Sequence, residues 1–215
     1  MEVEMRVTLK AYTVGAENLC GEAAAMCTNG KNPKRALAHA MEAGHESIVE
    51  HAAFTFEVEG VSRVLLAQLT RHRLASFSVQ SQRYCGAQYE WIVPPSIKAA
   101  NYTTLYEVAC SDSFTLYQRM VKDGVPPEDA RFVLPEGWAC RLMLTMNARE
   151  LRHFFSLRCC NRAQWEIREL ADKMLELCKG VAPALFEDAG PGCVRGACPE
   201  GKRSCGRPRG RHRNV

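Results

Sequence analysis

The residues best suited to chemistry stand together in the segment 71–84. Arg71, His72 and Arg73 follow an apolar run, and three serines and a further arginine, Arg83, come after them. Adjacent helical residues point about 100° apart, so the first three cannot share one solvated face. A basic side chain held against a buried element needs an anionic partner, and the arginine fork fits phosphate oxygens in pairs. The segment therefore indicates a phosphate-bearing ligand. A solvated helix end, favoured by the helix dipole, is the alternative.

The elements that position this segment are predicted from periodicity and capping. Alternating residues indicate strands, apolar residues at helical spacing indicate helices, and Asn32-Pro33 is a helix start. The predicted elements are a strand over 3–9, a helix from 33 to about 44, a short helical segment over 45–51, a strand over 54–58 ended by Gly60, and a helix over 61–69.

The second half of the chain shows the same kinds of signal. Asn147 with Glu150 predicts a capping box, in which the carboxylate reaches back to the cap, and Asn161 with Gln164 repeats the pattern. The predicted elements are a helix over 103–122, another from 126, a strand over 138–146, a helix over 148–158 and a long helix from 165. Strands and helices alternate without a regular βαβ rhythm, which predicts an α+β fold.

Composition limits the class of protein. The chain has 215 residues, of which 47% are hydrophobic and 24% charged, as in an ordinary globular domain. It has neither a membrane-spanning run nor a signal peptide, so we expect a cytoplasmic protein. Residues 189–215 hold seven basic side chains against one acid, Glu200, whereas the rest is close to neutral, with 21 basic and 23 acidic residues. We therefore expect one domain over 1–188 and a Cys-, Gly- and Arg-rich tail over 189–215.

Cysteine is frequent, with eleven in the chain. We interpret the eight outside the tail as small buried thiols in a reducing compartment. They are Cys20, Cys27, Cys85, Cys110, Cys140, Cys159, Cys160 and Cys178. The three tail thiols, Cys193, Cys198 and Cys205, lack the close pairing of a structural zinc site, which normally has four ligands. His212 or a body cysteine would have to complete one, so no metal is assigned, and a flexible or locally folded tail is the preferred interpretation.

One motif resembles a known family. Arg-His-Arg, seven further residues and a serine form the signature of the flavin-dependent thymidylate synthases, present here as Arg71-His72-Arg73 and Ser81, with Arg83 and Tyr84 following. The resemblance extends from about His39 to Phe186. The other matching segments are 45–51, 131–135, 147–149, 157–158 and 161–167.

The resemblance implies a role for individual residues. FAD is expected to contact His45, Ser47, Arg71, His72, Arg73, Val79, Asn147, Arg149 and His153. The substrate dUMP is expected to contact Gln68, Arg71, Gln80, Ser81, Gln82, Arg83, Arg131 and Arg158. Arg158 matches the residue that stabilises the ionised pyrimidine N3, which is a catalytic role because charge grows there in the transition state. Val79 departs from relatives with a polar residue, so only its backbone can make that contact, and Gln80 is a candidate replacement.

The same resemblance implies the reaction and the assembly. The family converts dUMP to dTMP, with 5,10-methylenetetrahydrofolate as carbon donor, reduced FAD as hydride source and NADPH as reductant, and releases tetrahydrofolate. It uses no cysteine nucleophile, which argues against Cys85. The expected architecture is a central mixed or antiparallel sheet flanked by helices in a homotetramer with shared active sites. The absence of Gly-x-Gly-x-x-Gly argues against a Rossmann-type dinucleotide site.

Several alternatives stay open on the residues alone. Asn147 with Glu150, and Ser47 with Glu50, have the spacing of ordinary helix caps. His153 and Trp165 fit a packed core, and Arg158 fits a favourable charge at a helix end. A nucleic-acid-binding protein would use 71–83 and the basic tail, but the interleaved aromatic residues of a stacking surface are missing, so this class is disfavoured. A flavoprotein without this activity, or one that alkylates another pyrimidine, is the third class.

Overall fold

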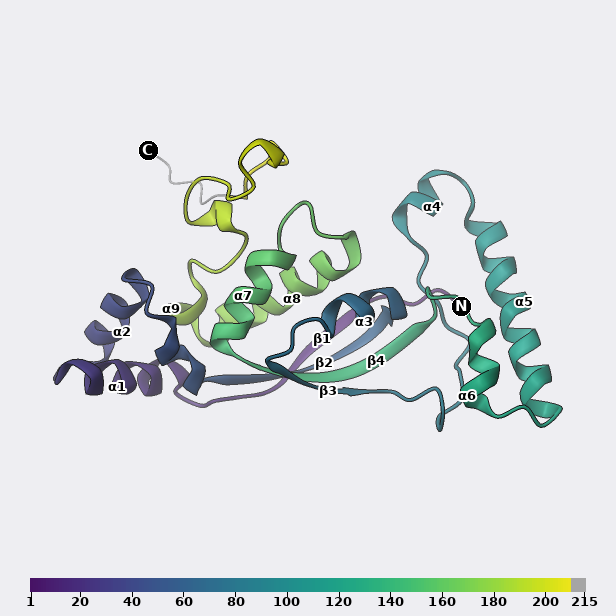
Figure 1. The fold of residues 1–215 in the computed structure, drawn as a ribbon, viewed down its shortest axis with the longest axis horizontal. Coiled ribbons are helices and arrows are strands. Elements are labelled where there is room, and N and C mark those ends of the chain that lie inside the picture. Colours follow the sequence, from purple (N-terminus) through teal and green to yellow (C-terminus); the bar gives the residue numbers. More distant parts are fainter. Residues whose placement is uncertain (210–215) are drawn as a thin grey trace. The chain divides into compact units, whose positions relative to one another are not determined.

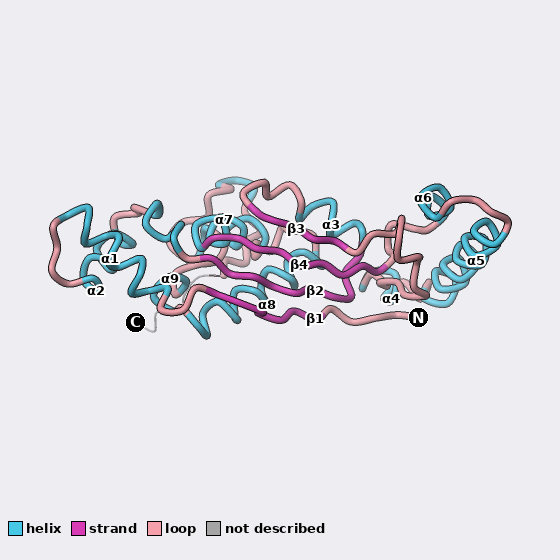
Figure 2. The backbone as a smooth tube through the Cα atoms, turned by 90° about the horizontal axis from the view of Figure 1, so that it is seen from below, coloured by secondary structure: helices cyan, strands magenta, loops and turns pink. Residues whose placement is uncertain are grey.

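The computed structural model describes residues 1–209. Four antiparallel strands form one sheet in the order β1-β2-β4-β3 (Figures 1 and 2). Their bounds are β1 Arg6–Tyr12, β2 Ala53–Ser62, β3 Ala75–Val79 and β4 Ala139–Asn147. Helices account for most of the remaining regular structure, so the predicted α+β class is confirmed.

The helices connect and flank these strands. The α-helices are α1 Ala16–Thr28, α2 Pro33–Glu42, α3 Arg63–Leu69, α4 Pro95–Ala99, α5 Thr103–Lys122, α6 Pro127–Ala130, α7 Ala148–Arg158, α8 Trp165–Val181 and α9 Pro183–Phe186. The 3₁₀-helices are η1 Glu46–His51, η2 Arg131–Val133, η3 Gly192–Val194 and η4 Gly201–Arg203. None of the helices within residues 1–209 is long and apolar enough to span a membrane.

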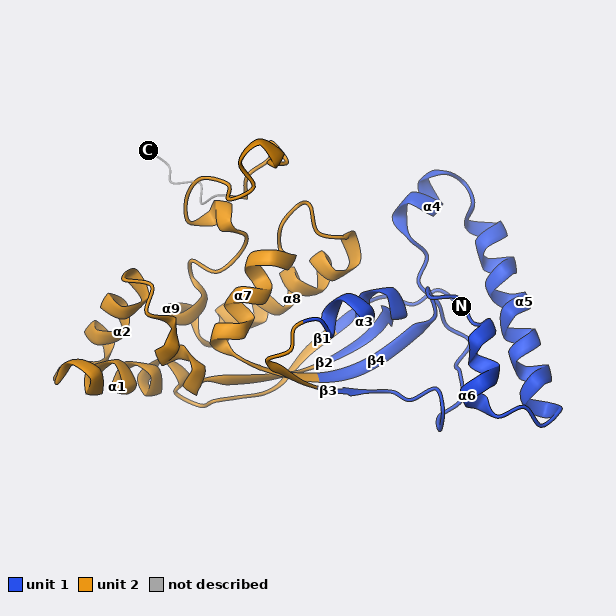
Figure 3. Cartoon of the chain, in the orientation of Figure 1, with its two compact units in different colours: residues 1–6, 57–71, 77–143 blue, residues 7–56, 72–76, 144–215 orange. Residues whose placement is uncertain are grey.

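The chain divides into two compact units (Figure 3). Unit 1 comprises residues 1–6, 57–71 and 77–143, and unit 2 comprises 7–56, 72–76 and the residues from 144 onward. In unit 1 the core is built on Trp138, whose ring stacks on Phe114 at 5.4 Å between centroids. In unit 2, Phe54, Phe155 and Phe186 are fully buried, and the ring of Phe186 meets the other two edge-on.

Most predicted elements are present, and their ends show where sequence rules fail. Helix α5 has the predicted bounds, and Asn32 caps α2 by accepting the Arg35 N–H at 3.1 Å. Strand β2 does not end at Gly60, as predicted, but continues to Ser62. Gly60 adopts a φ of +65°, and a Cβ there would lie 2.2 Å from the Glu4 carbonyl oxygen. Glycine at this position therefore lets the backbone of residue 4 approach β2 closely without ending the strand.

Two predicted caps are wrong in part. Asn147 does cap α7, since its side-chain oxygen accepts the Glu150 N–H at 2.9 Å, but the Glu150 carboxylate does not reach back. Helix α8 is capped by Gln164, whose side-chain oxygen accepts the N–H groups of the next turn. Asn161, the predicted cap, instead donates to the Arg207 carbonyl at 2.8 Å, because the tail supplies a competing acceptor.

The tail is folded onto unit 2 as far as residue 209. Arg209 forms a bidentate ion pair with Asp172, at 2.6 and 2.9 Å, and donates to the Cys159 carbonyl at 2.8 Å. Within residues 1–209 no group of three or more potential ligands is placed to hold a metal. The predicted involvement of His212, like the last basic residues, Arg211 and Arg213, lies outside the described residues.

The prediction of buried body cysteines is only partly right. Cys20, Cys110, Cys140, Cys159 and Cys178 are buried, whereas Cys27 and Cys85 are exposed and Cys160 is half-buried. Burial raises the pKa of the Cys20 thiol to about 11, which keeps it protonated at neutral pH. The buried thiols therefore act as small apolar side chains. The two exposed ones lie outside the core because Cys27 is on the exposed side of the last turn of α1, and Cys85 follows the turn that Ser81 begins.

Candidate active site

A buried polar centre in unit 2 joins the Arg-His-Arg motif to α7. His72 is 5% exposed and Glu150 is 6% exposed, and His72 Nδ1 lies 3.0 Å from Glu150 Oε1. Arg158 donates its Nε–H to His72 Nε2 at 3.2 Å. The ring of His72 also meets Phe154 edge-on at 5.0 Å. The predicted catalytic residue and the motif histidine are thus in direct contact.

The environment of His72 favours the neutral ring. Burial lowers the pKa of His72 below its ordinary value, Arg158 and His153 act in the same direction, and only the Glu150 carboxylate acts to raise it. The neutral form is the one that can accept a hydrogen bond from Arg158. The folded-state pKa is depressed, so this arrangement is complete above the ordinary histidine pKa of about 6.5 and is lost as the pH falls.

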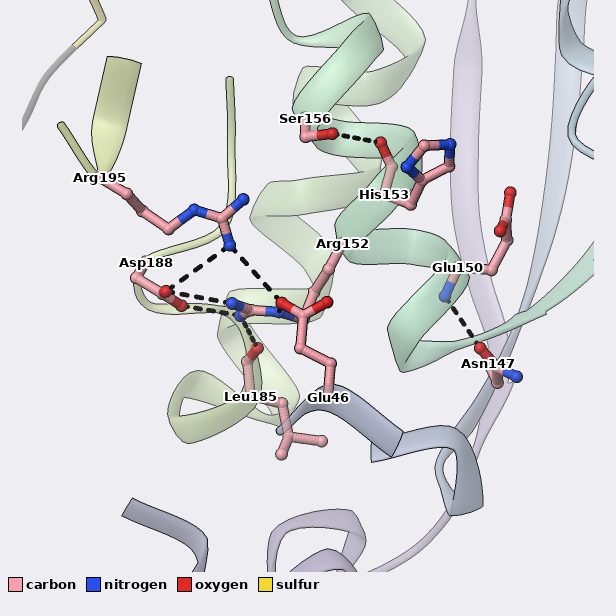
Figure 4. A network of polar contacts seen from close by, with 9 residues as sticks. All are labelled: Glu46, Asn147, Glu150, Arg152, His153, Ser156, Leu185, Asp188 and Arg195. Atoms are coloured by element: carbon pink, nitrogen blue, oxygen red, sulfur yellow. Dashed lines mark hydrogen bonds and ion pairs between the residues drawn. The ribbon is translucent and has the colours of Figure 1, made fainter. Parts of the chain in front are cut away.

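The opposite side of α7 is fixed by a second network (Figure 4). Arg152 is 3% exposed and donates to Glu46, to Asp188 and to the Leu185 carbonyl, at 2.6 to 3.0 Å. Burial alone would raise the pKa of Asp188, but the bonds from Arg152 hold it below its ordinary value. Arg195 of the tail adds longer contacts to the same two carboxylates. Glu46 stands between His45 and Ser47 in the chain, so this network fixes the segment that the FAD prediction names.

The other residues predicted for FAD in unit 2 are mostly open to solvent. His45, Ser47, Arg73 and His153 are exposed. Their exposed side chains keep them accessible to a ligand. Arg149 is also exposed, and it pairs with the Glu50 carboxylate. The alternative in which Ser47 and Glu50 cap a helix is wrong, because Ser47 lies inside η1, whose N-cap is His45, and Glu50 pairs with Arg149.

The residues predicted for dUMP that belong to unit 1 have a different character. Arg83 donates to the Glu128 carboxylate at 2.6 Å, and Arg131 donates its Nε–H to the Glu128 backbone carbonyl at 3.0 Å. Two guanidinium groups from distant parts of the sequence therefore meet at one residue. Ser81 accepts the Arg83 N–H at 3.1 Å, which holds the turn that carries Arg83.

The glutamines of this group lie near a cavity within unit 1. Gln80 and Gln82 line a cavity of about 420 Å³, together with Arg141 and Trp138. Gln68 is half-buried on α3. Arg71 and Val79 belong to the same unit: Arg71 is exposed, whereas Val79 is half-buried at the end of β3.

A second cavity, of about 550 Å³, lies wholly within unit 2. One wall comes from the end of α7 and the following loop, including Arg158 and Arg162, and the other comes from the tail, including Cys193 and Arg195. The tail therefore contributes to the surroundings of Arg158.

Sequence comparison assigns the family. The profile described as thymidylate synthase complementing protein matches residues 8–184. The chain belongs to this family. The match ends at residue 184, before the tail.

Known proteins of this family are similar over most of the chain. A flavin-dependent thymidylate synthase of Geobacter sulfurreducens is 54% identical over 171 residues, which cover 78% of this chain and 74% of that protein. One of Clostridium tetani is 42% identical and covers 94% of both chains. The fold resembles a crystal structure of the UMP/dUMP methylase PolB from Streptomyces cacaoi bound with 5-Br dUMP, with a TM-score of 0.78, 24% identity and coverage of 86% of this chain and 94% of that chain.

Three residues near the family's motifs were not predicted to have their observed roles. The sequence predicts Glu128 only as part of a helix start and Glu150 only as part of a cap, and it predicts no role for Arg152. For Glu150, a signal is present in the sequence: Glu150, Phe154 and Arg158 are four residues apart, and residues at this spacing share a helix face. The partners of Glu128 and Arg152 lie 45 and 106 residues away in the sequence, and no local signal indicates them.

Proposed function

We propose that this chain is a flavin-dependent thymidylate synthase, a methyltransferase that converts dUMP to dTMP with 5,10-methylenetetrahydrofolate as carbon donor and NADPH as reductant, and releases tetrahydrofolate. The family match over residues 8–184 and relatives of that name at 42 and 54% identity support this activity. The observation that carries it in the structure is the bond from Arg158 to buried His72, because it holds a cation in one direction before any ligand arrives.

In this proposal Arg158 stabilises the negative charge on the pyrimidine N3 of dUMP. A guanidinium cannot lose its proton in a protein, so it stays charged whatever charge forms beside it. A preoriented cation is most effective where charge develops, because no rearrangement is needed during the reaction. Removing a single such donor typically slows turnover by about 100- to 1,000-fold.

The unit 1 residues fit a nucleotide phosphate. Arg83 is bound to a carboxylate, Glu128, and a phosphate offers the same guanidinium a matching pair of oxygens with more charge. Arg131, at the backbone of the same residue, adds a second cation. Ser81, Gln80 and Gln82 supply further polar groups, and Gln68 and Arg71 complete the predicted set.

The donor set of unit 2 fits FAD. Arg73 is exposed and forms no ion pair with any residue from 1 to 209, so its charge is available for a diphosphate. His45, Ser47, His153 and the side chains of Asn147 and Arg149 offer further hydrogen-bonding groups. Arg71 and the backbone of Val79 stay predicted FAD contacts. When bound, FAD reduced by NADPH supplies the hydride that turns the one-carbon unit into a methyl group.

The assembly belongs to the same proposal. We expect a homotetramer in the cytoplasm, in which neighbouring chains share each active site. Sedimentation of the purified protein, with and without dUMP, measures the assembly directly.

Cys85 is exposed but takes no part in bond formation, because the family chemistry needs no thiol on the pyrimidine ring.

The activity is tested with purified protein under anaerobic conditions. We expect the visible absorption of bound flavin, and dTMP from dUMP only when methylenetetrahydrofolate and NADPH are both present. The control omits methylenetetrahydrofolate, which must abolish dTMP. Flavin without dTMP would contradict the proposed substrate, and a protein that takes up no FAD would contradict the proposal as a whole.

A further inference from the structure

One face of α7 carries three residues in line. Glu150, Phe154 and Arg158 recur every fourth residue, so each lies one turn beyond the last. His72 lies against this face, with its ring edge-on to Phe154 and its two nitrogens bonded to Glu150 and Arg158. The imidazole therefore bridges two charged side chains that stand about two helical turns apart.

The two bonds require the same tautomer of His72. The Nε of Arg158 always bears a hydrogen and has no lone pair to offer, so His72 Nε2 must be the acceptor. The neutral ring then has its hydrogen on Nδ1, where it donates to the Glu150 carboxylate at 3.0 Å. A carboxylate placed beside Nδ1 thus keeps Nε2 free to accept from the arginine.

We propose that Glu150 and His72 are positioning residues that together set the direction of the Arg158 guanidinium. In this account the histidine of the Arg-His-Arg motif acts through Arg158, since both its ring nitrogens have partners within the chain. The inference depends on the proposed function for its meaning in catalysis, but the arrangement can be tested without any turnover.

Burial and charge are consistent with this chain of hydrogen bonds from Glu150 through His72 to Arg158, which we call the relay. Glu150 is 6% exposed, and a buried carboxylate is costly without a donor, which His72 provides. The charged and titratable groups that face His72 are Glu150, Arg158 and His153, all on α7. Protonation of the ring would place an N–H against the Arg158 N–H, so the relay exists only with neutral His72.

The first test uses variants that differ in what they can bond. Glu150→Gln removes the charge that selects the tautomer, and we expect turnover to fall by about 10- to 100-fold, because small misplacements of a reacting group have effects of this size. His72→Gln keeps one donor and one acceptor, and His72→Leu keeps neither. We expect the glutamine variant to retain at least about tenfold more turnover than the leucine variant. Glu169→Gln, the same change at a surface carboxylate of α8, is the matched control and leaves turnover unchanged.

The second test measures the pKa of His72 and needs no turnover. Hydrogen exchange at the ring carbon of a histidine, followed by mass spectrometry against pH, gives the pKa of that residue. His72 is the sole histidine between His51 and His153, so one peptide isolates it. We expect Glu150→Gln to lower the pKa of His72 further and Arg158→Met to raise it, since these neighbours act on it in opposite directions. Thermal unfolding and flavin content show that each variant is folded.

The outcomes separate the relay from the proposed function. Opposite pKa shifts in a protein that makes no dTMP contradict the thymidylate synthase proposal and leave the arrangement standing. Formation of dTMP with neither shift, or equal turnover in His72→Gln and His72→Leu, overturns the relay alone. A merely structural role for Glu150 would lower the unfolding temperature without moving the His72 pKa in this pattern.

Discussion

The two groups of candidate residues differ in how far the protein has already fixed them. In unit 2, Arg158 is held by buried His72, and α7 is held from its other side by buried Arg152. In unit 1, Arg83 is half exposed and bonded to a half-exposed carboxylate. The first group has few conformations left to lose, whereas the second is held by a surface ion pair of the kind that contributes little to stability.

The difference corresponds to two tasks. A cation that stabilises a transition state is effective when its direction is set beforehand, because reorganisation would add to the barrier. A cation that captures a phosphate must be reachable, and it can exchange one anion for another. We call Arg158 with His72 and Arg152 the rigid group, and Arg83 with its partner Glu128 the open group. We infer that catalysis is assigned to the rigid group and substrate capture to the open group. Substitutions in the two groups should therefore affect different measurements.

The largest effect is expected where the rigid group is anchored. Arg152→Met removes the buried cation of this network and leaves Glu46 and Asp188 with only the longer contacts from Arg195. Because a lost hydrogen bond to a charged group typically costs about 1.5 to 3 kcal/mol and both carboxylates are partly exposed, we expect the free energy of unfolding to fall by about 2 kcal/mol or more. Urea unfolding measures the loss. Arg119→Met, at an exposed helical pair with Asp123, is the matched control and should change stability by less than about 0.5 kcal/mol. Equal stability of the two variants would mean that α7 is not anchored in this way.

A smaller effect is expected in the open group. Arg83→Ala removes the charge-assisted contact that we propose for Arg83 with the dUMP phosphate. We therefore expect the KM for dUMP to rise about tenfold, while turnover at saturation and the unfolding temperature stay near wild type. Steady-state kinetics at varied dUMP concentrations measure both constants. A fall in turnover with an unchanged KM would place Arg83 with the rigid group and remove the distinction.

The smallest effect is expected from changing Glu128, the carboxylate that is bonded to Arg83. Glu128→Gln removes a competing carboxylate, so dUMP should bind about two- to threefold more tightly, in keeping with the small energy of an exposed pair. Calorimetric titration with dUMP measures this change. Weaker binding in the variant would show that Glu128 supports Arg83 during capture instead of competing for it.

The same contrast shows what the sequence could predict. Helices α2 and α5 were predicted with nearly correct ends because their signals, a cap and a helical period, are local. The capping box at Asn147 was half right, because the Glu150 carboxylate has a stronger partner in His72, 78 residues away. Strand β3 was missed, since its alternating serines resemble a binding loop. The site residues came from family resemblance, and their partners, such as Glu128, required the fold.

The most direct test of the central claim separates the two halves of the reaction in Arg158→Ala. One experiment follows flavin reduction by NADPH, and the other follows dTMP formation from a pre-reduced enzyme in a single turnover with saturating dUMP. We predict that flavin content and reduction stay within about twofold of wild type, while dTMP forms at least about 100-fold more slowly. A single-turnover rate within twofold of wild type would contradict the claim that Arg158 stabilises the reacting pyrimidine.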